Sequence, residues 1–216
     1  MDLEYFFRGM WDEITPAQRR ELTEASKTVA VEKVKLLKSG SSLYAVSKGR
    51  LRVFINSYDG REVTLYRLLK GDFCLFSASC MLENIKFDIL IEAETDAEII
   101  EIPHAVYQGI METSAAAANF TNKIMAARFS NVMWLMEQIL FKRMDSRIAS
   151  FLLEESEVEN RRLLTITHDR IASHIGTARE VVTRMLKYFQ SEGIVKLSRG
   201  VILITDADKL NDLAGR

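Results

Sequence analysis

The segment from 167 to 200 restricts the fold more than any other part of this chain, because its two predicted helices must cross at close range. It reads THDRIASHIGTAREVVTRMLKYFQSEGIVKLSRG. The small Ala172 stands where two helices would cross, and Gly176 stands where the turn between them requires a positive φ. Apolar side chains occupy the faces that would pack together: Ile175, Val182 and Met185. The spacing predicts a helix-turn-helix over 168–187.

A β-hairpin is predicted directly after the second of these helices. The stretch IVKLSRGVILIT, residues 194–205, consists of two β-rich runs joined at Arg199-Gly200. An amphipathic helix, MDSRIASFLLEES, and a short strand, NRRLLTIT, precede the helix-turn-helix. Together these elements predict a winged helix-turn-helix domain over 143–216.

The second predicted helix begins with charged side chains that suit the major groove of DNA. Arg179 and Arg184 carry forked guanidinium groups that match O6 and N7 of guanine, and Glu180 can accept a hydrogen bond from N4 of cytosine. Residues 165–200 hold six arginines and lysines against three carboxylates, a modest cationic excess that favours a phosphate-facing surface. Further contacts to bases or phosphates are predicted for His168, Thr177, Thr183, Lys187, Lys196 and Arg199.

Two features of this segment have a second, purely structural interpretation. Thr177-x-x-Glu180 matches a capping box, in which the glutamate would accept a hydrogen bond from a backbone N–H at the start of the helix. That role and base reading can coexist. His168 and His174 are expected at the surface or near phosphate rather than as metal ligands, and no metal site is predicted.

The N-terminal half has the rhythm of a small β-structure. RLRVFI at 50–55 and REVTLYRL at 61–68 alternate around an Asp-Gly turn, which predicts a hairpin. The strand pattern continues to 102, and Pro103 ends it. Short strands at this spacing predict a barrel or roll, here with jelly-roll-like character. A short helix with Thr15 as N-cap and Pro16 at its first position precedes the strands, so the fold class is α+β.

A long helix is predicted from about 114 to 143, roughly 45 Å at 1.5 Å per residue. Apolar residues recur along it at spacings of four and three, as in a coiled-coil seam: Met125, Phe129, Val132, Met136 and Ile139. Packing of this face against the chain's own β-structure is the alternative. Because the helix outreaches a small domain, we expect the seam to join two copies of the chain in a homodimer.

Composition excludes several classes of protein. The chain of 216 residues has only two cysteines, too few for a disulfide-stapled secreted domain. Neither a signal peptide nor a long apolar run occurs, so a cytoplasmic protein without membrane contact is expected. The predicted roll contains no histidine before His104, which leaves neither a histidine–carboxylate metal cluster nor a nucleophile with its base. An enzyme is therefore not expected.

The chain resembles the CRP/FNR family of bacterial transcription regulators over nearly its whole length. The resemblance rests on DGREVTLYRLLKGDFCLFSASCML (59–82), ARFSNVMWLMEQILF (127–141) and the segment at 167–200, where G-x-x-R-E-x-x-x-R is similar to the family's recognition helix. It implies an effector-sensing, cyclic-nucleotide-binding-like roll over 1–113, a dimerisation helix over 114–142 and a DNA-binding domain over 143–216. It also implies a half-site with a TGA-like core, doubled into a near-palindrome, and RNA polymerase as a partner.

The effector is not determined by this resemblance. Cyclic-nucleotide binders of the family use a Gly-Glu stretch followed by an arginine, but here Asp72 replaces the glutamate and no arginine occurs between Arg67 and Arg128. Tight binding of cyclic AMP is not expected, because a buried phosphate would lack its arginine. An iron–sulfur cluster of the family's oxygen sensors needs four cysteines, and because this chain has two, such a cluster within one subunit is not expected. The cofactor is left unknown.

The sequence leaves several alternatives for the effector or redox signal that the predicted roll would sense. Cys74 and Cys80 are candidates for a redox pair, or are simply small buried residues. Haem at His104 or at a cysteine, and an apolar small molecule between roll and long helix, are further alternatives. The candidate effector residues are Asp72, Cys74, Phe76, Cys80, Met81, Phe129 and Trp134.

A second class of function is a signalling module that binds an effector and uses its winged helix to contact another protein. The arginine–glutamate–arginine group at 179–184 favours DNA, because a protein-binding wing does not need it.

Overall fold

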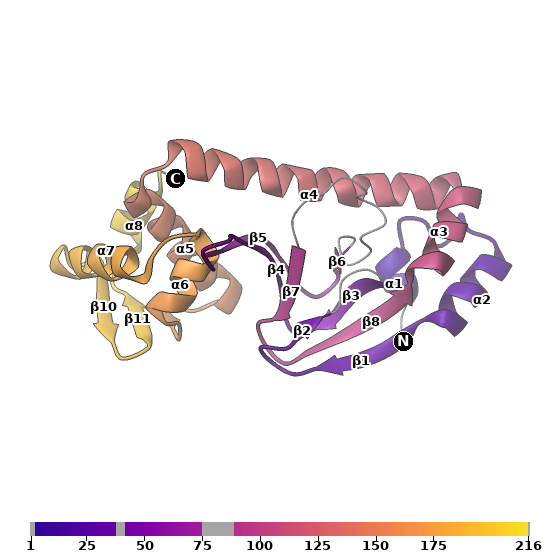
Figure 1. Ribbon diagram of the computed structural model, residues 1–216, viewed down its shortest axis with the longest axis horizontal. Coiled ribbons are helices and arrows are strands. Elements are labelled where there is room, and N and C mark those ends of the chain that lie inside the picture. The colour runs from indigo at the N-terminus through magenta and orange to yellow at the C-terminus, as the bar shows by residue number, and fades with distance from the viewer. Residues whose placement is uncertain (1–2, 38–41, 75–88, 216) are drawn as a thin grey trace. The chain divides into compact units, whose positions relative to one another are not determined.

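The computed structural model describes residues 3–37, 42–74 and 89–215. Helices and strands are mixed, which confirms the α+β class (Figure 1). The chain divides into two compact units. The roll unit comprises Met1–Ile55 and Leu65–Met133, and the helix-turn-helix unit comprises Asn56–Thr64 and Trp134–Arg216.

Within its described residues, the predicted roll consists of two four-stranded antiparallel sheets. One has the order β1 (Lys27–Val31), β8 (Ala97–Pro103), β3 (Ser42–Lys48), β6 (Phe73–Cys74). The other has the order β2 (Leu36–Leu37), β7 (Ile89–Ala93), β4 (Leu51–Asn56), β5 (Glu62–Leu68). The predicted hairpin is thus confirmed as β4 and β5. Its turn is closed by Ser57 N–H donating to Arg61 O at 2.8 Å, with Gly60 at φ +79°.

One strand of this roll buries a charge. In β4, the apolar residues Leu51, Val53 and Phe54 are buried, but Arg52 is also fully buried. Its guanidinium lies 4.2 Å from the centre of the Phe54 ring, and its Nη1 lies 3.5 Å from Glu92 Oε2 on β7. A buried charge needs such pairing to persist, so the cross-strand partner is part of what holds the arginine inside.

Helices cover one end of the roll unit. They are α1 (Leu3–Phe7), α2 (Pro16–Ala25), α3 (His104–Thr113) and the first part of α4 (Ala115–Phe141). Their apolar residues share a core with Phe73 and Ile102. As predicted, Thr15 caps α2, and Gln18 completes the capping box. The rings of Phe73 and Phe120 meet edge to face at 5.7 Å, which ties the start of α4 to the sheet.

The helix-turn-helix unit confirms the predicted order of elements as far as the wing: α5 (Met144–Glu159), β9 (Leu163–Leu164), α6 (His168–Ile175), α7 (Arg179–Ser191), β10 (Val195–Ser198) and β11 (Val201–Ile204). A last helix, α8 (Ala207–Ala214), was not predicted. β10, β11 and β9 form one antiparallel sheet, so β10–β11 is the wing. Ile171, Val182 and Leu186 are fully buried in a common core with α5. Across the described ranges, no helix is long and apolar enough to cross a membrane.

Candidate nucleic-acid interface

The turn between α6 and α7 has the geometry that Gly176 predicts. Gly176 lies at φ +70°, and its N–H donates to Ala172 O at 2.9 Å. The N–H of Thr177 donates to the same carbonyl at 3.1 Å, so the end of α6 is closed by the backbone. A Cβ on Gly176 would come within 2.5 Å of Val63 Cγ2. Both the left-handed φ and this contact require glycine, and together they fix where α7 begins.

An arginine on α5 braces the same turn. Arg147 Nη2 donates to Ile175 O, the last carbonyl of α6. Burial lowers the pKa of Arg147 from its ordinary value. The sequence gives little sign of this role, because its only signal is an arginine at the start of the largely apolar stretch RIASFLL. Arg147 holds α6 against α5 and so positions the whole helix-turn-helix.

Replacing Arg147 with methionine is expected to lower the free energy of unfolding by about 1–3 kcal/mol, because a buried carbonyl loses its donor. Urea denaturation measures the change. Arg143→Met is the matched control, since the Arg143 side chain is 87% exposed and forms an ion pair with the nearby Asp145. Equal losses in the two variants would contradict the bracing role.

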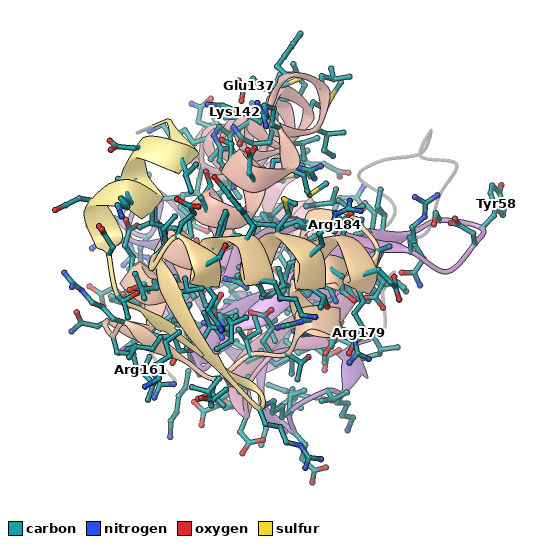
Figure 2. All side chains as sticks on the ribbon, turned by 90° about the vertical axis from the view of Figure 1, so that its left-hand side faces the viewer. Tyr58, Glu137, Lys142, Arg161, Arg179 and Arg184 are labelled. Atoms are coloured by element: carbon teal, nitrogen blue, oxygen red, sulfur yellow. The ribbon has the colours of Figure 1, made fainter. Side chains whose placement is uncertain are left out.

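Five of the predicted DNA contacts come together on the exposed face of α7. Arg179, Glu180, Thr183, Arg184 and Lys187 line an open hollow of about 510 Å³. In Figure 2, Arg179 and Arg184 lie toward the same end of α7. Glu180 and Arg184 are four residues apart, as are Arg179 and Thr183, and residues at that spacing share one helix face. The helix therefore presents two adjoining rows of polar side chains on one surface.

The capping-box interpretation of Glu180 is wrong. The N-cap of α7 is Ala178, and no side chain caps this end. Because the helix begins at Arg179, Glu180 is its second residue, one short of the position that a capping box requires. Thr177 lies before the N-cap, and its N–H closes the end of α6. Glu180 is exposed, so its carboxylate faces the hollow.

Two contacts from the start of α6 engage the predicted reading residues. Asp169 Oδ2 lies 3.2 Å from Arg179 Nη1, and both side chains are more than half exposed. His168 Nδ1 lies 2.9 Å from Thr183 Oγ1. Partial burial, and then the positive charge of Arg179, lower the pKa of His168, while Asp169 opposes the shift. The neutral form of His168 is thus favoured, and the DNA contact predicted for Arg179 would compete with an exposed ion pair.

The remaining predicted contacts lie apart from the hollow. Lys196 is exposed on β10, and Arg199 is exposed at the turn of the wing.

His174, in contrast to the surface position expected for it, is buried. Its ring packs on Phe151 at 5.1 Å, and its Nδ1 lies 2.8 Å from Thr64 Oγ1. His174 is a core residue of the helix-turn-helix unit.

The predicted dimer seam is largely solvent-exposed. Phe129 is 67% exposed, and Met136 and Ile139 are nearly half exposed. Val132 is partly buried, and Met125 packs partly against the core of the roll unit. Other large apolar side chains of α4 are also exposed: Met133, Trp134, Leu140 and Phe141. A single subunit therefore leaves a row of apolar groups uncovered.

The predicted effector residues fall into four groups. Phe76, Cys80 and Met81 lie outside the described residues. Phe129 and Trp134 are exposed on α4, and Cys74 is fully buried in β6. Asp72 pairs with Arg128 on α4, and the distance from Arg128 Nη2 to Asp72 Oδ1 is 3.0 Å. Arg128 was not among the predicted effector residues. Among the residues that the structure describes, no group of three or more histidines, cysteines or carboxylates could hold a metal ion.

Two family models match this chain. The cyclic nucleotide-binding domain matches residues 36–114, and the Crp-like helix-turn-helix domain matches residues 146–213. The second range contains all the residues that line the hollow on α7. The family models thus cover both the sensing and the DNA-binding parts expected from the sequence.

Individual proteins agree with these models. A crystal structure described as that of a CRP/FNR-family transcriptional regulator from Eubacterium rectale is 47% identical, with a TM-score of 0.93 over 97% of this chain and 99% of that one. The Cyclic AMP receptor protein of Thermus thermophilus is 27% identical over 81% of this chain and 80% of its own length. FixK2 from Bradyrhizobium japonicum is 19% identical and shares the fold, with a TM-score of 0.69 over 87% of this chain and 96% of that one.

Proposed function

Because this chain belongs to the CRP/FNR family of transcription regulators, we propose that it binds double-stranded DNA as a homodimer on a near-palindromic site. A signal received in the roll unit controls that binding. The observation that carries the proposal is the open hollow on α7, where two arginines, a lysine, a glutamate and a threonine converge. This combination suits the edges of base pairs flanked by phosphates.

The arrangement of α7 supports distinct roles for its residues. Arg179, at the first position of the helix, and Arg184 read guanines, and Glu180 accepts from cytosine. Lys187 lies further along the helix, and together with Arg199 on the wing and His168 it contacts phosphate. Thr177 and Thr183 complete the interface with short polar contacts. In this proposal, Arg179, Glu180 and Arg184 determine which bases are bound. The other side chains fix the position of the protein along the DNA.

The uncovered apolar row on α4 supports the homodimer. Two copies that bury Phe129, Met136 and Ile139 against each other would remove these groups from water. Two-fold symmetry then sets two α7 helices about 34 Å apart, one turn of DNA, and this spacing doubles the half-site. RNA polymerase is the proposed partner through which such a complex would act on transcription.

The sequence argues against one effector of the roll unit, cyclic AMP, and does not identify another. One relative is named a cyclic AMP receptor protein, but this chain has no arginine between Arg67 and Arg128 that could hold a cyclic phosphate. We therefore expect an effector other than cyclic AMP. Cys74 is fully buried, so a redox role for it would require the thiol to become accessible.

Selection from a pool of random-sequence DNA duplexes tests the proposed function. The full chain is expected to enrich a near-palindrome with half-sites one helical turn apart, and its affinity should fall steeply with salt. Lys187→Ala should weaken binding to all sequences about equally and lower the salt slope by about 1 per half-site. No enriched sequence, together with salt-insensitive binding, would point to a protein-binding wing.

A further inference from the structure

Arg128 is a charged residue buried within the roll unit. It lies on α4, yet it is only 9% exposed. Its Nη2 donates to Asp72 Oδ1 at 3.0 Å and to the carbonyl of Phe73 at 3.3 Å. One face of the guanidinium lies 4.9 Å from the centre of the Tyr66 ring. Arg128 thereby connects the long helix to Tyr66 on β5 and Phe73 on β6.

This guanidinium is only partly satisfied. Its Nε is buried and has no hydrogen-bond partner among the described residues. A buried donor without an acceptor is unfavourable, and such a group in a folded protein points to a missing water, ion or ligand. The N–H groups of Nε and Nη2 form one edge of the fork, which a carboxylate or phosphate can bind with two oxygens at once. In this structure that edge holds a single acidic oxygen.

Asp72 is a partner that can be displaced. Its side chain is 37% exposed, in contrast to Arg128. Its other oxygen, Oδ2, accepts from the Leu69 N–H at 2.8 Å and stays anchored to the turn. An oxyanion that replaced Oδ1 would keep the charge pairing of Arg128 and add the missing bond to Nε. The exchange therefore loses one single-point contact and gains a two-point contact.

We propose that Arg128 is the receptor for the oxyanion head group, carboxylate or phosphate, of a small-molecule effector, and that this group displaces Asp72. The proposal deepens the proposed function, since it supplies from α4 the arginine that the stretch after Gly71 lacks. Phe129, the next residue along α4, belongs to the proposed dimer seam. A change in the bonding of Arg128 therefore acts on the helix that carries that seam.

The N–H resonance of arginine Nε gives a direct test. In ¹⁵N-labelled full-length protein, the Arg128 Nε–H signal is identified by its loss in Arg128→Lys. Inorganic phosphate and acetate are titrated separately, with sodium chloride at equal ionic strength as the control. We expect the signal to shift saturably with one of the two oxyanions and not with chloride. The oxyanion that saturates identifies the head group.

Asp72→Asn is the informative variant, because it removes the competing charge without removing the arginine. Saturation is expected at about tenfold lower oxyanion concentration or less, corresponding to about 1.4 kcal/mol. Absence of a saturable shift in both the wild type and Asp72→Asn overturns the inference and leaves water as the occupant of Nε. If Asp72→Asn does not fold, the wild-type titration decides alone.

The Arg128 site and the proposed DNA-binding function can be refuted independently of each other. DNA selectivity of the same preparation is measured by fluorescence anisotropy. Selective DNA binding without an oxyanion shift refutes the Arg128 site and leaves the regulator intact. A saturable shift without selective DNA binding refutes the regulator and leaves the binding site.

Discussion

Arg179→Ala is expected to weaken binding to the selected DNA site by about 1–3 kcal/mol per half-site, roughly 5- to 150-fold, and to relax the choice of base at one position. The expected loss reflects a guanidinium at the first position of α7 that faces the open hollow. Binding must first release Arg179 from Asp169, but an exposed ion pair is worth only about 0–1 kcal/mol. The gain from a base contact outweighs that cost.

Arg161→Ala is the matched control for this variant. Arg161 is also an exposed arginine of the helix-turn-helix unit, and its Nη2 lies 2.9 Å from Glu159. It does not line the hollow on α7. Fluorescence anisotropy with the selected duplex and a scrambled one gives both affinity and selectivity. Equal effects of the two substitutions would show that Arg179 contributes charge alone and reads no base.

Met136→Glu is expected to convert the dimer to monomers. Met136 is 47% exposed in the single subunit and lies in the middle of the seam on α4. Burying a methionine contributes about 1.5–3 kcal/mol, and the substitution also sets a carboxylate from each subunit in an apolar interface. The dimer dissociation constant should rise about 100-fold or more, corresponding to about 2.7 kcal/mol. Sedimentation velocity over a range of protein concentrations measures it.

Ser130→Glu controls for the added charge. Ser130 is exposed on the same helix, but it is not at a seam position. Its variant should remain a dimer. If Met136→Glu sediments like the wild type, the apolar row on α4 is not the contact between subunits. DNA binding should fall together with dimerisation, because each half-site alone supplies only part of the affinity.

Local sequence was sufficient for most secondary structure. Gly176 predicts its turn because a positive φ is strained for other residues, and the structure places it at +70°. Thr15 with Pro16 predicts the start of α2, and the Asp-Gly pair at 59–60 predicts the β4–β5 turn. These features depend on neighbours within a few residues, so the chain encodes them locally.

The capping box at Thr177 shows where local patterns fail. The sequence contains the capping-box pattern, a threonine followed three residues later by a glutamate. The helix α7, however, begins one residue further along the chain than a capping box at Thr177 requires. The end of α6 uses the Thr177 N–H first. Two neighbouring helices competed for the same backbone group, and a single-helix rule does not describe that competition.

The sequence by itself determined the winged helix-turn-helix, the two-sheet roll and the surface of α7, because periodic side chains specify which face of an element is apolar. Only the tertiary structure decided which charges are buried and what they contact. Buried Arg52 contacts Glu92, half-buried Arg147 contacts the end of α6, and buried Arg128 contacts Asp72. Burial of a charge depends on partners 28 to 56 residues away in the sequence, and periodicity carries no information about contacts at that range.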